Sequence, residues 1–195
     1  MGRDRGKMGK DVQEINLKVL NLGCGYKKMI GATNVDAYKV CDPDVLHDLN
    51  NFPYPWEDGE IDRIYATHVF EHLEEWWKAF KECSRVLKKG GIIEIRVPDV
   101  SNSTALSYRD HLHVFTWHSF NGTRHSNGDL YGAGANAWAE GEVGSVPFQL
   151  VEYIQVPFGK YEWMIKWCPW VLNWCANHLR NFIHEQCFIF KKIGG

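Results

Sequence analysis

Hydrophobic positions in this chain fall into short runs bounded by glycine and proline, with two longer segments of helical period among them. Leucine and valine dominate residues 17–22, and this run ends at Gly23-Cys24-Gly25. A short apolar run that stops at a glycine turn is typical of a buried strand. By the same pattern we expect further strands over 33–36, 61–66, 92–97, 148–156 and 187–193.

A helix is predicted over 69–89, between two of the expected strands. Its apolar residues recur at helical spacing, at Phe70, Leu73, Trp77, Phe80 and Leu87. Lys88-Lys89-Gly90-Gly91 would supply a cationic last turn and a glycine stop. Strand, helix and strand joined by short links predict parallel pairing with helices packed on the sheet, which is the α/β class.

The first crossover, from 17–22 to 33–36, is abbreviated. Only about ten residues separate the two expected strands, too few for the full helix of a dinucleotide-binding βαβ unit. A nicotinamide-dependent oxidoreductase is therefore disfavoured.

The second half of the chain is less regular. Six glycines fall between Gly122 and Gly144, so we interpret 101–147 as a long excursion, and excursions of this length are usually functional. Residues 161–183 have helical period but contain Pro169. In this segment four tryptophans form one stripe if the proline is absorbed as a kink or as a second helix start: Trp163, Trp167, Trp170 and Trp174.

Composition fits one globular domain. The 195 residues are 45% hydrophobic and 24% charged with a net charge of -2, so we expect a single domain over 15–195. The start of the chain is basic and glycine-rich, so we expect a flexible leader over 1–14. The near-neutral charge gives no reason to expect nucleic acid as a partner. Six scattered cysteines suit a reducing compartment, so a cytoplasmic location is expected, and no segment predicts a transmembrane span.

The segment Val19–Lys28, with its Leu-Asn-Leu-Gly-Cys-Gly core, resembles the first motif of class I S-adenosylmethionine-dependent methyltransferases. Asp36 ends the second expected strand, where family members bind the ribose hydroxyls. His47-Asp48-Leu49 resembles the acidic segment beside the adenine, and 61–73 resembles the fourth strand and its exit. Asn21 replaces an acidic residue of many members, and the third glycine is absent.

This resemblance implies a doubly wound, mostly parallel, Rossmann-like methyltransferase sheet with helices on both faces, and S-adenosyl-L-methionine as cofactor. It implies these cofactor-binding residues: Asn21, Gly23, Cys24, Gly25, Asp36, Ala37, Asp48, Leu49, Thr67, His68 and His72. A side chain at Gly23 or Gly25 is expected to occupy cofactor space.

A narrower resemblance, to a compact prokaryotic and viral branch with the same opening, extends through 97–99 and 110–120, although Asp99 replaces a histidine of that branch. It implies that 101–147 is an insertion or lid on the acceptor side. Candidates for a general base are His111, His113, His68 and Asp110. The His-x-His pair beside Asp110 raises the question of a metal, but a complete ligand set is not visible in the sequence, and none is predicted.

The resulting hypothesis is methyl transfer to a small-molecule or glycan-type acceptor, because the branch often occurs among sugar and cell-envelope enzymes. The alternative is a non-catalytic cofactor-binding module that acts through association. The tryptophan stripe is interpreted first as core packing. It could also be a wall of the acceptor pocket, a homodimer face or a contact with a membrane surface.

Overall fold

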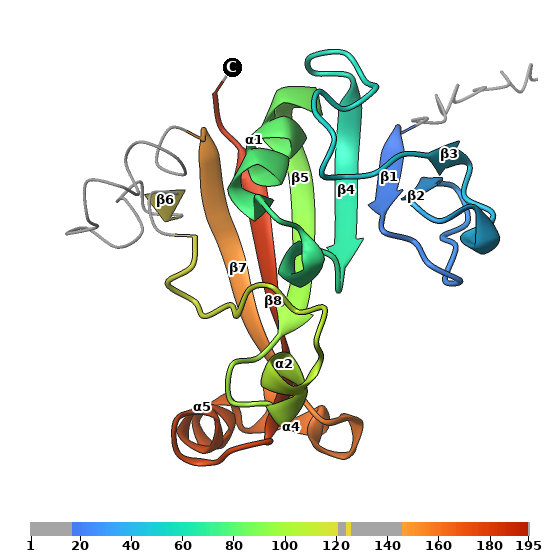
Figure 1. The fold of residues 1–195 in the computed structure, drawn as a ribbon. Coiled ribbons are helices and arrows are strands. Elements are labelled where there is room, and N and C mark those ends of the chain that lie inside the picture. Colours follow the sequence, from blue (N-terminus) through green and yellow to red (C-terminus); the bar gives the residue numbers. More distant parts are fainter. Residues whose placement is uncertain (1–16, 121–123, 126–145, 195) are drawn as a thin grey trace, which may run out of the picture.

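The computed structural model describes residues 17–120, 124–125 and 146–194. In this part of the chain, eight strands form one sheet in the order β3-β2-β1-β4-β5-β8-β7-β6 (Figure 1). Their bounds are β1 (Val19–Leu22), β2 (Thr33–Asp36), β3 (Val45–Leu46), β4 (Ile61–Thr67), β5 (Leu87–Pro98), β6 (Arg124–His125), β7 (Phe148–Pro157) and β8 (Ile183–Lys192). The predicted leader 1–14 lies outside the described residues, as do 121–123 and 126–145 of the predicted excursion.

The helices are α1 (Trp76–Val86), α2 (Ser103–Ser107), α4 (Trp163–Trp167) and α5 (Pro169–His178), with 3-10 turns η1 (Lys39–Cys41), η2 (Phe70–His72) and η3 (Gly159–Tyr161). Strands β1 to β5 pair in parallel, with Leu22 opposite Val35 on one side and Ala66 on the other. Strand β8 runs antiparallel between β5 and β7. The α/β doubly wound class is therefore confirmed.

The abbreviated first crossover is also confirmed, since residues 23–32 form no helix. The chain moves from β1 to β2 in one direction across the sheet and from β4 to β5 in the other, so right-handed crossovers lie on opposite faces. Helix α1 covers one face of the sheet. On the opposite face Arg63 is exposed and Glu94 and Arg96 are only half-buried, so this face is covered less completely than the expected helices on both faces would cover it.

The predicted helix over 69–89 is divided and ends earlier. Turn η2 comes first, α1 follows, and β5 begins directly at Leu87, so Gly90 and Gly91 lie within the strand. A β-carbon on Gly91 would lie 3.1 Å from the carbonyl oxygen of Asp62, so a side chain there would crowd β4. Gly91 thus permits the close pairing with β4, and neither glycine ends the helix.

Aromatic side chains join α1 to the C-terminal strands. The Phe80 ring lies 4.8 Å from that of Phe148 and 5.3 Å from that of Phe190, measured between centroids. Phe120 packs 5.1 Å from Phe80, and all four rings are fully buried. Burying each such side chain contributes about 1.5–3 kcal/mol, so this cluster holds Phe120 against α1 and the C-terminal strands.

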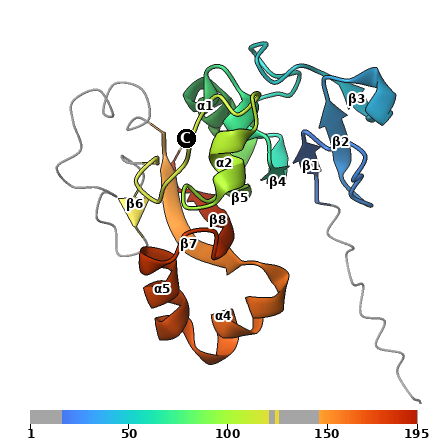
Figure 2. The ribbon, with the colours of Figure 1, turned by 60° about the horizontal axis from the view of Figure 1, so that its bottom comes forward.

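Helices α4 and α5 lie beyond the end of the sheet at which β4 and β5 terminate, and both views agree on this position (Figures 1 and 2). Pro169 begins α5, which confirms a second helix start. The tryptophan stripe is not core: its members are 55–76% exposed. The buried face instead carries Met164, Leu172 and Cys175, packed on Ile183.

The core interpretation of the tryptophans was wrong because two stripes share one period. Met164, Cys168, Leu172 and Cys175 recur at helical spacing just as the tryptophans do. Hydrophobic period alone does not decide which stripe faces inward.

Candidate functional site

The strand order reverses between β1 and β4, and open α/β sheets bind ligands in the crevice beyond the strand ends at such a point. A cavity of about 450 Å³ lies there. Seven of the predicted cofactor residues line it: Gly23, Asp36, Ala37, Asp48, Leu49, His68 and His72. Asp110, a base candidate, lines it as well.

The turn after β1 takes its shape from two left-handed glycines. Gly23 has a φ of +60° and Gly25 a φ of +49°. A β-carbon on Gly23 would collide with Cγ2 of Val69, so close packing on the segment after β4 requires this glycine, a reason the sequence did not reveal. Nothing lies within 4 Å of the corresponding position on Gly25.

Asp36 is buried at the end of β2 and faces this turn. Its Oδ2 accepts a hydrogen bond of 2.8 Å from the Gly25 amide, and its Oδ1 accepts one of 2.9 Å from the Tyr38 amide. A carboxylate offers about four lone-pair sites, so acceptor capacity remains for a ligand in the cavity. The backbone thus holds the carboxylate in place at the cavity wall.

Asn21 does not line the cavity, contrary to its predicted role. Its Nδ2 donates to Lys27 O at 3.2 Å and to Asn34 Oδ1 at 2.9 Å. Asn34 in turn donates from its amide and its side chain to Oδ2 of Asp44, both at 2.8 Å. These hydrogen bonds from Asn34 lower the pKa of Asp44 below its ordinary value. The three side chains brace the crossover that lacks a helix.

Other predicted cofactor residues stand back from the cavity. Cys24 is buried, with its thiol 3.5 Å from the Gly25 carbonyl oxygen, and burial raises its pKa. Gly25 and Thr67 do not line the cavity either. Residues that sequence reasoning missed complete the lining: Tyr38, Asn50, Val69, Leu73 and Leu112. Most of these adjoin predicted residues in the chain, which is the only signal that could have found them.

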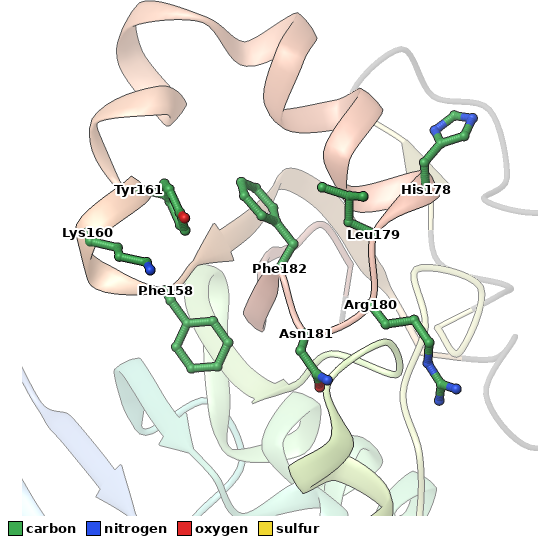
Figure 3. A pocket seen from close by; sticks show the side chains of 8 residues that line it. All are labelled: Phe158, Lys160, Tyr161, His178, Leu179, Arg180, Asn181 and Phe182. Carbon is green, nitrogen blue, oxygen red and sulfur yellow. The ribbon is translucent and has the colours of Figure 1, made fainter.

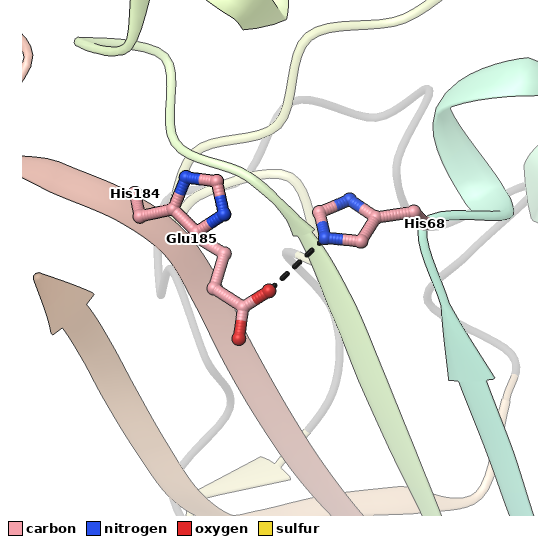
Figure 4. A group of neighbouring side chains, drawn as sticks. All are labelled: His68, His184 and Glu185. Atoms are coloured by element: carbon pink, nitrogen blue, oxygen red, sulfur yellow. Dashed lines mark hydrogen bonds and ion pairs between the residues drawn. The ribbon is translucent and has the colours of Figure 1, made fainter. Parts of the chain in front are cut away.

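His68 directly follows β4 with a φ of +54° and is held by two carboxylates. Its Nε2 lies 3.1 Å from Glu185 Oε2 (Figure 4). Its Nδ1 lies 3.1 Å from Glu71 Oε1. The hydrogen bonds to Glu185 and then to Glu71 raise the pKa of His68 to about 9. Protonated at neutral pH and with both ring nitrogens engaged, His68 suits a fixed cation better than a general base.

A second cavity of about 350 Å³ adjoins the first. His68, His72 and Asp110 line both cavities, while His111 and His184 line only the second. His113 lines neither, because its Nε2 lies 3.2 Å from the Glu74 carbonyl oxygen and its ring faces Trp77. Of the four base candidates, the structure therefore gathers three at these adjoining cavities.

A further cavity, of about 750 Å³, lies apart from this site (Figure 3). It is lined by residues of 158–161 and 178–182, among them the cations Lys160 and Arg180. None of the predicted cofactor or base residues lines it. Its volume is therefore not evidence that it binds the cofactor or the acceptor.

Residues 20–95 match the methyltransferase domain family. No significant relative was found among curated protein sequences. A SAM-dependent methyltransferase from Archaeoglobus fulgidus has a similar structure, with a TM-score of 0.57 and 16% identity, over 90% of this chain and 86% of that one.

The YcgJ protein from Bacillus subtilis aligns with a TM-score of 0.54 at 15% identity, over 92% of this chain and 93% of that one. A [4+2]-cyclase aligns with a TM-score of 0.50 at 16% identity, over 92% of this chain and 76% of that one. At these identities the likeness shows the Rossmann-like α/β fold alone. No helix in the described ranges is long and apolar enough to cross a bilayer.

Proposed function

We propose that this chain is an S-adenosyl-L-methionine-dependent methyltransferase that acts on a small-molecule or glycan-type acceptor. One observation carries the proposal: the Gly23 turn and the Asp36 carboxylate line the same cavity, at the reversal of strand order. The match of residues 20–95 to the methyltransferase domain family supports it independently.

The cavity suits the cofactor in size and in donor set. Its volume of about 450 Å³ lies within the range of small-molecule sites. Asp36 would accept hydrogen bonds from the ribose hydroxyls, and the buried side chains of Leu49, Val69 and Leu73 offer an apolar wall to the adenine. When bound, the sulfonium supplies a methyl group with a good leaving group. The chain itself has to align the acceptor and remove its proton.

The second cavity is the proposed acceptor site. His72 and Asp110 line both spaces, so an acceptor beside them would lie next to the cofactor. His111 completes this wall and is preferred to His113 as the general base, because His113 lines neither cavity.

Six free cysteines agree with the expected cytoplasmic location.

A non-catalytic cofactor-binding module is the second candidate. Asp99 favours it, because this residue replaces a histidine of the related branch. Its side chain is buried, and its Oδ1 accepts a 2.8 Å hydrogen bond from the Ser101 amide. The [4+2]-cyclase adds that a related fold serves another reaction. Consumption of labelled cofactor with an extract as acceptor source supports the enzyme, and stoichiometric binding without turnover supports the module.

Calorimetry with S-adenosylhomocysteine tests the cofactor site. Asp36→Ala should weaken binding by about 1–3 kcal/mol, or about 5- to 150-fold, because charge-assisted hydrogen bonds to the ribose are lost. His111→Ala is the matched control, since its side chain lines only the second cavity; it should keep cofactor affinity and lose turnover. Unchanged affinity in Asp36→Ala, or no binding by the unaltered protein, would refute the assignment.

A further inference from the structure

Three residues with metal-ligating side chains meet in the wall of the second cavity. Glu71 and His72 lie in turn η2, and His111 lies 39 residues further along the chain. One ligand atom from each lies within 4.8 Å of the other two. The backbone fixes this meeting, because the amides of Leu112 and His113 donate to the Glu71 carbonyl oxygen at 2.8 and 3.2 Å.

Backbone carbonyl oxygens hold one ring nitrogen of each histidine and leave the other free for a metal ion. His72 Nδ1 lies 2.9 Å from the Asp110 carbonyl oxygen, and His111 Nδ1 lies 3.2 Å from the Ala105 carbonyl oxygen. A carbonyl only accepts hydrogen bonds, so each Nδ1 carries the proton and each Nε2 keeps its lone pair. Metal-bound histidines commonly donate their other ring nitrogen to a carbonyl in this way.

Glu71 adds an unsatisfied carboxylate. Its side chain is 1% exposed. Oε1 pairs with His68, whereas Oε2 is buried and has no hydrogen-bond partner among the described residues. Buried polar atoms are rarely left without a partner, so Oε2 indicates a ligand that would complete its contacts.

We propose that Glu71, His72 and His111 bind a divalent first-row transition metal ion such as Zn²⁺. Two imidazoles and one carboxylate suit these ions, whereas Mg²⁺ and Ca²⁺ prefer sets of oxygen ligands. Three protein ligands leave at least one position open. His72 and His111 line the second cavity, so the open position would face the acceptor.

The role of the ion rests on the proposed methyl transfer. An acceptor hydroxyl at the open position would lose its proton more readily to Asp110 or to water. The acceptor oxygen then forms a bond to the methyl carbon as the carbon–sulfur bond breaks. Neutral S-adenosylhomocysteine and one proton leave, so charge and atoms balance.

A neighbouring group, formed by His68, His184 and Glu185, is less suited to an ion (Figure 4). Both ring nitrogens of His68 are already paired with carboxylates. Arg96 also donates to Glu185 Oε1 at 2.8 Å, which supplies the positive charge that an ion would bring. This group is satisfied, whereas Glu71 is not.

Titration of the chelator-treated full chain with Co²⁺ tests the site, followed by calorimetry and by the visible spectrum of the bound ion. We expect one ion per chain, and at least a tenfold loss of affinity in Glu71→Gln and in His111→Gln. His178→Gln, at the exposed end of α5, should bind as the unaltered protein does. Near-ultraviolet circular dichroism of each variant checks that the fold is retained.

No Co²⁺ binding by the unaltered protein, or equal affinity in folded Glu71→Gln and His111→Gln, would overturn the metal site. Loss of binding in His184→Gln alone would overturn it as well, because the ion would then lie in the neighbouring group. Titration with S-adenosylhomocysteine separates the two proposals. Cofactor binding without Co²⁺ binding refutes only the metal, and Co²⁺ binding without cofactor binding refutes only the proposed function.

Discussion

The two adjoining cavities are built in different ways. The first takes its shape from backbone turns at the ends of neighbouring parallel strands, with Gly23 and Asp36 only 13 residues apart. The second is formed by side chains from four distant segments, at 68–72, 98, 104–111 and 184. A backbone-built site has a local sequence signature, whereas a site of converging side chains acquires its geometry only in the folded chain.

Among variants at the two cavities, the largest expected effect on stability concerns the backbone-built one. Gly23→Ala should lower the free energy of unfolding by about 2–4 kcal/mol, because it combines an unfavourable positive φ with a collision against Val69. Gly25→Ala has the same kind of φ and open space, so it should cost only about 1–2 kcal/mol. Urea denaturation of both variants measures the difference.

A double variant separates the two causes. Val69→Ala removes the colliding methyl groups, so the cost of Gly23→Ala should be smaller in that background. If Gly23→Ala and Gly25→Ala were equally destabilising, packing on Val69 would not be the reason for the first glycine.

The sequence predicted more of the first cavity than of the second. The strand over 33–36 and the shortened crossover were predicted because period and turn residues are local signals. Glu185 and His184 were missed, because only pairing of β5 with β8 brings 184–185 beside His68. Glu71 was missed although it lies three residues after His68, because its burial and its unpaired Oε2 appear only in the folded chain. Asn21 was assigned to cofactor binding from its position in the family motif. In the structure it donates a hydrogen bond to Asn34 instead, because the short crossover departs from that motif.

A second, smaller effect tests the brace that replaces the first helix. Hydrogen bonds from Asn34 lower the pKa of Asp44, so its stabilising contribution is present above the ordinary pKa of an aspartate and is lost as the pH falls below about 4. Asp44→Asn should therefore lose less of its melting temperature than the unaltered protein between pH 5 and pH 3.

Asp42→Asn is the matched control, because Asp42 pairs with Lys28 at the surface, outside the brace. It should follow the acid dependence of the unaltered protein. Identical acid dependence in all three proteins would show that Asp44 does not stabilise the crossover.

The smallest expected effect concerns the tryptophan stripe of α4 and α5, which the hydrophobic period wrongly predicted to be core. Trp167 and Trp170 are 73% and 76% exposed, so replacing either with serine should change the free energy of unfolding by no more than about 0.5 kcal/mol. Leu172→Ala, on the buried stripe of the same helices, should cost about 2–5 kcal/mol. Urea denaturation of the three variants compares the stripes directly. A tryptophan variant as unstable as Leu172→Ala would mean that this face packs against protein, as its period alone suggested.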